Sequence, residues 1–224
     1  MELLRSHTPK GARAREHIVR SAERLFAASG FHGTSMRDVA IACDQPLASV
    51  VYHFARKEQL YAAVLGEIGE QLVAQLSAAV EDDARSWALR LDAVVRALLH
   101  WTESHPGRVK LLLRELLDNP ARVARASRLP LAPVLLRLSE FVSAGIEAGA
   151  FRAATPETSV LHLVGAVSYF VAARPTVKRI VGAARDRKLM ASYDGEAIDL
   201  ARRMFLVTGE TEAGRRPNAR MKAR

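Results

Sequence analysis

Hydrophobic side chains recur every three to four residues over most of this chain, which is the spacing of one face of an α-helix. The pattern predicts helices over residues 12–29, 36–43, 47–54, 57–80, 86–104, 108–117, 133–148, 156–173 and 194–207. Proline and glycine separate several of these segments, because neither residue continues a helix well. The sequence therefore predicts an all-α protein.

The stretch from residue 34 to residue 57 predicts two short helices joined by a tight turn. Ser35 and Asp38 have the spacing of a capping box, in which each side chain satisfies a backbone N–H of the first helical turn. Asp44-Gln45-Pro46 then interrupts the apolar pattern and is typical of a turn. Two short helices with such a turn form a helix-turn-helix, whose second helix can enter a DNA major groove.

The second helix of this motif has an outer surface suited to DNA. Val50 and Phe54 are expected to point inward, so the other positions lie at or near the surface. Small residues on this surface would let the backbone approach DNA. Tyrosine and histidine can hydrogen-bond to phosphates, and a lysine at the N-terminus of the next helix can also bind a phosphate. The predicted DNA-binding residues are Ser35, Arg37, Leu47, Ala48, Ser49, Tyr52, His53 and Lys57. A helix-turn-helix also occurs in proteins that never touch DNA, so a protein-interaction module is the alternative.

The segment Gly30–Leu65 resembles the DNA-binding domain of the TetR/AcrR family of transcriptional regulators. The matching residues are Gly30-Phe31, Thr34-Ser35, Ile41-Ala42, Tyr52-His53-Phe54, Lys57-Glu58 and Leu60. Asp44 departs from the family's pattern, which usually has a small residue there, often glycine, and Val51 stands where an aromatic residue is common. The resemblance implies an N-terminal three-helix helix-turn-helix domain and a C-terminal helical bundle. It also implies a sequence-specific repressor that a small-molecule effector releases from its operator.

Composition is compatible with such a protein. The 224 residues include 33 Lys and Arg against 24 Asp and Glu, a net charge of +9 that indicates either polyanion binding or a solvated basic surface. Cys43 is the single cysteine, so no intramolecular disulfide is expected, and its apolar position predicts a small core residue. We expect a cytoplasmic protein, because the N-terminus lacks an apolar signal core and no stretch approaches the ~20 apolar residues of a membrane span.

The sequence predicts four regions along the chain. Residues 1–11 are expected to be a disordered basic arm, 12–56 the helix-turn-helix domain, 57–208 a helical effector-binding and dimerisation domain, and 209–224 a disordered basic tail. The long helix from residue 57 joins the two domains. The resemblance implies that this helix carries the signal from the effector site to the DNA-binding head.

The predicted helix 156–173 is apolar nearly all round, so it must be buried on more than one side. The resemblance implies a homodimer in which the last two helices of each chain form a four-helix bundle. The candidate interface residues are Val160, Leu161, Val164, Val167, Ile198 and Phe205. A dimer would place two recognition helices about 34–36 Å apart, for successive major grooves of a pseudo-palindromic double-stranded operator. The alternative is a monomer in which this helix is the central core helix.

The resemblance also implies a small-molecule site in the second domain. Candidate effector-binding residues are His100, Trp101, Arg114, His162, Ala166, Tyr169 and Phe170, and each of them could equally serve packing or an ordinary ion pair. The chain has no HExxH, Walker, GxGxxG or GxSxG motif and no Cys–His metal spacing. We therefore expect no enzyme, no metal and no cofactor; a small helical enzyme would need a clustered acid and base.

Overall fold

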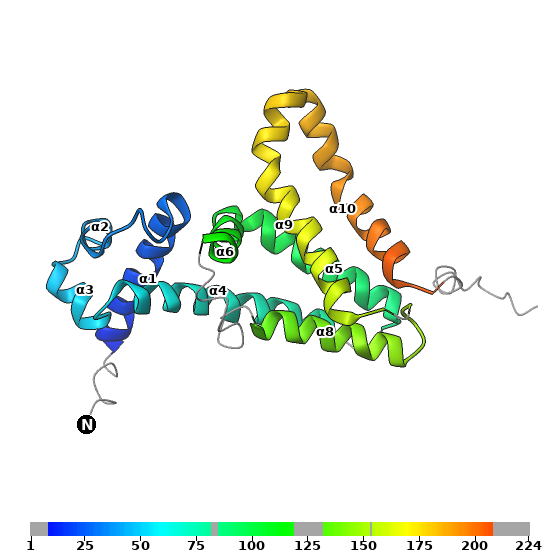
Figure 1. Ribbon diagram of the computed structural model, residues 1–224, viewed down its shortest axis with the longest axis horizontal. Helices are drawn as coiled ribbons and strands as arrows, with labels where there is room; N and C mark the ends of the chain where they lie inside the picture. Colours follow the sequence, from blue (N-terminus) through cyan, green and yellow to red (C-terminus); the bar gives the residue numbers. More distant parts are fainter. Residues whose placement is uncertain (1–8, 82–84, 119–131, 153, 208–224) are drawn as a thin grey trace, which may run out of the picture. The chain divides into compact units, whose positions relative to one another are not determined.

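The computed structural model describes residues 9–81, 85–118, 132–152 and 154–207. Its helices are α1 (Pro9–Ser29), α2 (Met36–Ala42), α3 (Leu47–His53), α4 (Lys57–Val80), α5 (Trp87–Ser104), α6 (Pro106–Asp118), α8 (Ala132–Glu147), α9 (Pro156–Val181) and α10 (Ala183–Phe205). The described residues contain no β-strand, only an isolated bridge between Phe151 and Leu206. The prediction of an all-α fold is confirmed (Figure 1).

The first helix begins earlier than the apolar pattern predicted. α1 starts at Pro9, so residues 9–11 of the expected disordered arm are helical. Proline suits the first helical position, where its fixed φ fits the helix and its missing N–H is not needed. The rest of the predicted arm, and the predicted tail 209–224, lie outside the described residues.

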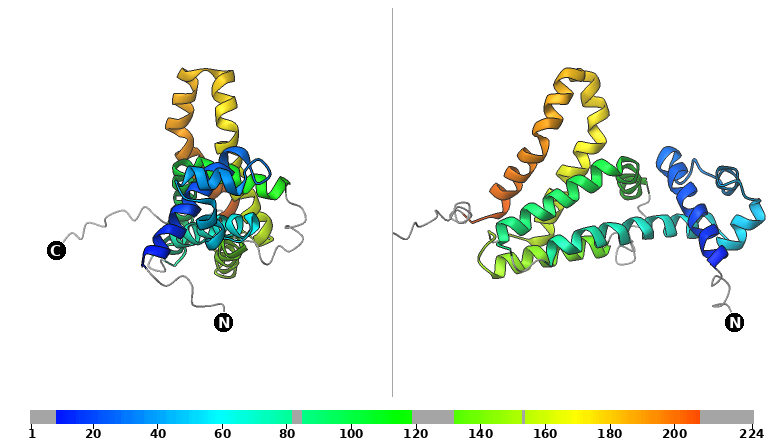
Figure 2. Two further views of the ribbon diagram at one scale, coloured as in Figure 1. Left: turned by 90° about the vertical axis from the view of Figure 1, so that its left-hand side faces the viewer. Right: turned by 180° about the vertical axis from the view of Figure 1, so that it is seen from behind.

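The end of the chain differs more from the prediction. α9 continues to Val181 instead of ending near residue 173. Pro175 lies inside the helix and removes one backbone N–H, but the helix continues on both sides of it. α10 begins at Ala183 instead of Asp194. Gly182 separates the two helices with a φ of +82°, a left-handed conformation that glycine adopts readily. Figures 1 and 2 show α9 and α10 as an antiparallel pair.

The described residues divide into two compact units. The first takes the chain up to Ala74 together with Trp101–Val134 and Phe170–Ala172, and the second takes the remaining segments. α4 and α5 therefore each contribute to both units. The predicted domain limits at residues 56 and 208 stay a prediction.

The core of the first unit is built around aromatic rings. Phe26 of α1 packs edge-on against Tyr61 of α4 with ring centroids 4.9 Å apart, and Phe31 lies 5.1 Å from Tyr61. Phe26 and Tyr61 are buried. α2 and α3 pack beside α1 and the beginning of α4 in Figure 1. This packing holds the helix-turn-helix against α1 and the beginning of α4.

α6 is attached to α1 within the same unit. The guanidinium of Arg108 donates to both carboxylate oxygens of Glu23, at 2.6 and 3.0 Å. Arg114 donates through Nη1 to the carbonyls of Ala27 and Ala28, at 3.3 and 3.2 Å. A cation at these carbonyls also stabilises the C-terminal end of the helix dipole of α1.

A cluster of rings forms the core of the second unit. Phe151 lies 5.5 Å from Trp87 and from Phe141, and 5.7 Å from Phe205, between ring centroids. The ring of Phe151 sits where a Cβ on Gly145 would be, only 2.2 Å from it. Only glycine at this position of α8 permits the contact. The cluster thus joins α5, α8 and α10.

α9 has one buried and one exposed side in the single chain. Val160, Leu163 and Val167 are buried within it, whereas Leu161 and Tyr169 are exposed. α9 is therefore not buried on all sides by its own chain. Its length and composition also suffice to cross a membrane, contrary to the expectation from sequence, and apolar helices of soluble proteins share both properties.

Candidate nucleic-acid interface

The capping box at the start of α2 is confirmed. The Oγ of Ser35 accepts a hydrogen bond from the backbone N–H of Asp38 at 3.1 Å, and the Asp38 carboxylate accepts from the Ser35 N–H at 2.8 Å. The Ser35 hydroxyl also donates to that carboxylate at 2.7 Å. These hydrogen bonds lower the pKa of Asp38, because they favour its charged form. The chain direction is therefore fixed where α2 begins.

The turn between α2 and α3 contains a strained residue. Asp44 has a φ of +50°, the only positive φ of a non-glycine residue within the described ranges. Aspartate tolerates this region better than most residues, but glycine adopts it at lower cost. This geometry explains why a glycine suits this position in the family that the sequence resembles. Cys43, just before it, is a buried core residue as predicted, and burial raises the pKa of its thiol.

α3 has one buried and one exposed side. Val50 and, just after the helix, Phe54 are buried with 0% and 4% of their surface exposed, as predicted. The exposed residues of α3 are Leu47, Ala48, Val51 and Tyr52, while Ser49 and His53 are half-buried. The rings of Tyr52 and His53 meet edge-on at 5.3 Å. The structure thus brings the predicted α3 residues onto a single short helix with a shared outer face.

Lys57 has a contact that the sequence did not predict. Its ammonium group donates to the backbone carbonyls of Phe31 and Thr34, at 2.8 and 2.9 Å. It also lies 4.3 Å from the centroid of the Phe31 ring. Lys57 therefore holds the loop that leads into the Ser35 cap. Its contact with a phosphate stays a prediction.

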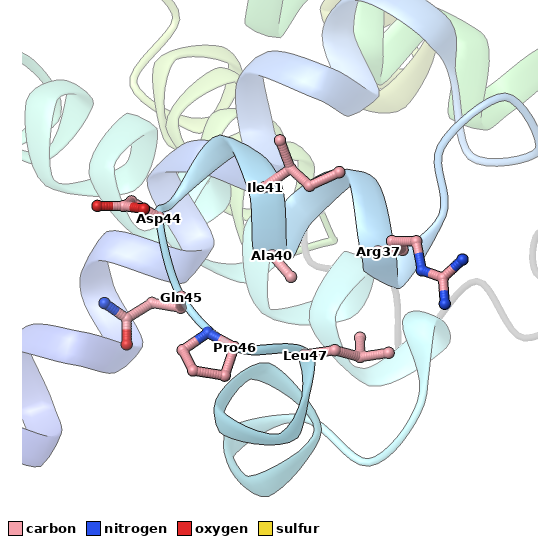
Figure 3. A pocket seen from close by; sticks show the side chains of 7 residues that line it. All are labelled: Arg37, Ala40, Ile41, Asp44, Gln45, Pro46 and Leu47. Carbon is pink, nitrogen blue, oxygen red and sulfur yellow. The ribbon is translucent and has the colours of Figure 1, made fainter.

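An open hollow of about 540 Å³ lies between α2 and the beginning of α3. Figure 3 shows its lining residues, which are Arg37, Ala40, Ile41, Asp44, Gln45, Pro46 and Leu47. Leu47 and Arg37 lie on one side of it, and Asp44 and Gln45 lie on the other. Sequence reasoning selected only Arg37 and Leu47 from this set. Ile41, one helical turn after Arg37, could have been found from that spacing, and it is 74% exposed.

The predicted effector residues are divided between the two units. His100, His162, Ala166 and Tyr169 belong to the second unit and are exposed, whereas Trp101, Arg114 and Phe170 belong to the first. Arg114 already caps the end of α1, as described above. Trp101 is buried, and its indole Nε1 has no hydrogen-bond partner among the described residues. The assembly of the predicted effector residues into one pocket stays a prediction.

Most predicted dimer residues point into their own chain. Val160, Val167, Ile198 and Phe205 are buried within it, and Val164 is half-buried. Leu161 is 60% exposed, so it alone of the six presents most of its surface outside. The apolar pattern could not separate the two sides of an all-apolar helix. The large apolar side chains exposed on α9 and α10 are Leu161, Tyr169, Ile180 and Leu200.

The described residues contain no group of three or more His, Cys, Asp or Glu side chains that could hold a metal ion. The first unit instead presents a capped helix, a tight turn and a short helix with an exposed face. That arrangement is the geometry of a helix-turn-helix reader of DNA.

Comparison with known proteins points to the same kind of protein. A family model for "Bacterial regulatory proteins, tetR family" matches residues 18–64, and one for "Tetracyclin repressor-like, C-terminal domain" matches residues 89–199. The HTH-type transcriptional regulator RutR of Escherichia coli is 24% identical over 166 residues, which are 74% of this chain and 77% of RutR.

Solved structures share the fold. A putative TetR-family transcription regulator from Shewanella sp. PV-4 superposes with a TM-score of 0.66 at 20% identity, over 87% of this chain and 98% of that one. AibR, solved with isovaleryl coenzyme A and operator DNA, superposes with a TM-score of 0.57 at 24% identity, over 70% of this chain and 85% of AibR. Because models of both the N-terminal and the C-terminal domain of this family match, the chain belongs to the TetR family of bacterial transcriptional regulators.

Proposed function

We propose that this protein is a cytoplasmic, homodimeric repressor that binds a pseudo-palindromic double-stranded operator and leaves it when a small-molecule effector binds. The observation that carries the proposal is the exposed face of α3, held by a capped α2 and a packed aromatic core. The net charge of +9 favours a polyanionic partner.

In this proposal the predicted site residues divide into two roles. His53 and Lys57 contact phosphates, together with Ser35 and Arg37 at the beginning of α2, and these contacts set position without reading sequence. Leu47, Ala48, Ser49 and Tyr52 of α3 meet the base edges in the major groove. Lys57 also keeps the loop before α2 in place through its bonds to two carbonyls.

The effector acts through the helical domain. The neighbour AibR was solved with an acyl coenzyme A and operator DNA, so a relative of this fold handles both kinds of ligand. Here the unpartnered indole N–H of buried Trp101 would gain an acceptor from a ligand. A ligand releases DNA only if it binds one spacing of the two heads more tightly than the other. α4, which begins at Lys57, is the element through which that spacing would change.

The test is a selection of random duplex DNA by the purified full chain, read by sequencing at near-physiological salt. We expect enrichment of a pseudo-palindrome whose half-sites lie about 34–36 Å apart. Weak, salt-sensitive binding without enrichment would contradict the proposal, and it would favour the alternative of a protein-interaction module.

A Lys57→Ala variant tests the phosphate contact. We expect lower affinity for all sequences alike. The slope of the logarithm of the binding constant against the logarithm of the salt concentration should also fall by about one for each DNA-binding domain. Thermal unfolding measured in parallel separates this effect from the loss of the two carbonyl bonds. An affinity that falls with an unchanged salt slope would show that Lys57 acts only by holding the loop.

A further inference from the structure

The outer face of α3 is mostly apolar. Leu47 and Val51 lie one helical turn apart and are 40% and 43% exposed, and Ala48 lies beside them. Tyr52, which is 64% exposed, completes this face. The seven residues of α3 include no Arg, Lys, Asn, Gln, Asp or Glu.

This composition restricts how α3 can read bases. Guanine is usually recognised by Arg or Lys, adenine by Asn or Gln, and cytosine by Glu or Asp. The major-groove edge of a base pair has one large apolar group, the C5-methyl of thymine. An apolar reading face gains free energy only where it covers such a group.

We propose that Leu47 and Val51, with the methyl group of Ala48 beside them, are specificity-determining residues that recognise thymine C5-methyl groups in the operator. The inference rests on the proposed function, because it requires α3 to enter the major groove. The inference specifies which chemical group of the bases α3 recognises.

The surroundings of Leu47 favour A·T pairs as well. Leu47 lines the open hollow together with Ile41, which is 74% exposed, and Gln45 lies on the opposite side of that hollow (Figure 3). A glutamine amide can bond the N6 and N7 atoms of adenine. Gln45 and Leu47 flank the hollow from opposite sides, so the amide adds adenine recognition to the thymine recognition of Leu47.

The size of the effect follows from the area that a methyl group buries. Covering one methyl or methylene group changes an equilibrium constant by about fourfold. Removal of a thymine methyl under Leu47 or Val51 should therefore weaken binding about fourfold, and removal in both half-sites about sixteenfold.

The experiment starts from the operator obtained by selection. Each thymine is replaced in turn by deoxyuridine, which keeps the base pair and its hydrogen-bonding groups and removes only the methyl. We expect about fourfold weaker binding at the thymines that face α3, and no change at flanking thymines. Leu47→Ala and Val51→Ala should each lose the response at the thymine that the deleted side chain covers.

The controls separate the possible outcomes. Leu89→Ala, at an exposed apolar position of α5, should keep the full response to deoxyuridine. Alanine is a strong helix former, so both α3 variants should fold, and circular dichroism checks this. Equal affinity for thymine and deoxyuridine operators would overturn the inference while the proposed function stands. An unchanged response in both α3 variants would overturn the assignment to these side chains. Failure to select any operator would count against the proposed function instead.

Discussion

Single residues decide how the reading head is held. Asp44 occupies a left-handed conformation that lets the chain turn from α2 into α3. Lys57 reaches from the beginning of α4 to the carbonyls of Phe31 and Thr34. Asp44 was visible in the sequence as a departure from the family's pattern. The loop contact of Lys57 was not visible in the sequence, because Lys57 lies 26 positions after Phe31 and 23 positions after Thr34.

The strain at Asp44 predicts different stabilities for two small substitutions. Asp44→Gly should be more stable than Asp44→Ala by about 1 kcal/mol, because only glycine adopts a positive φ without a Cβ clash. Urea unfolding of the two variants and the parent protein measures the difference. Equal stability of the two variants would show that residue 44 carries no backbone strain.

At the scale of elements, α6 is joined to α1 by side chains that are distant in sequence. Arg108 and Glu23 are 85 positions apart, and their side chains are 14% and 17% exposed. Partly buried charge pairs of this geometry are stronger than pairs in full solvent. The unit that carries the helix-turn-helix therefore includes α6.

The Arg108–Glu23 pair predicts coupled stability effects. We expect Arg108→Ala and Glu23→Ala each to cost about 1.5–3 kcal/mol, with the double variant costing clearly less than the sum, because both remove one charged hydrogen-bonded pair. Arg20→Ala is the matched control, since its pair with Glu16 has side chains 59% and 57% exposed. That control should change stability by less than about 1 kcal/mol. Additive single effects would contradict the coupling.

The aromatic cluster of the second unit gives another prediction at this scale. Gly145→Ala should destabilise the protein by about 1–3 kcal/mol, because the new Cβ would overlap the ring of Phe151. A Cβ on Gly66, in α4, would meet no atom within 4 Å apart from the backbone of its own helix, so Gly66→Ala should stabilise the protein by about 0.5–1 kcal/mol. Thermal unfolding of both variants measures the contrast. A neutral Gly145 variant would mean that Phe151 moves aside without cost.

At the scale of the whole molecule, α9 presents an exposed apolar side. Leu161 and Tyr169 are 60% and 74% exposed, and Gly165 between them is also exposed. Each of these three residues lies four positions after the one before it, so they form a single stripe on the helix. Exposed apolar surface of this kind marks protein interaction sites. We infer that a second copy of the chain covers it.

This inference predicts the behaviour of a charged variant. Leu161→Glu should convert the dimer to a monomer and weaken operator binding, because a carboxylate would be buried in the interface without a partner. Leu136→Glu, on α8, changes a similarly exposed leucine and should leave the dimer intact. Sedimentation of both variants measures the assembly. A dimer that survives Leu161→Glu would place the interface elsewhere.

The sequence by itself determined the all-α fold, the capping box and the buried side of α3, because helix periodicity and capping depend on residues three or four positions apart. It missed the start of α10, because a run of charged residues obscured the break at Gly182. Only the tertiary structure decided what each helix packs against. It attached α6 to α1, directed Lys57 to the loop before α2, and placed Val160 and Val167 inside the chain while Leu161 stayed outside. Such choices depend on contacts between distant segments, and an apolar pattern identifies a surface to be buried without identifying what covers it.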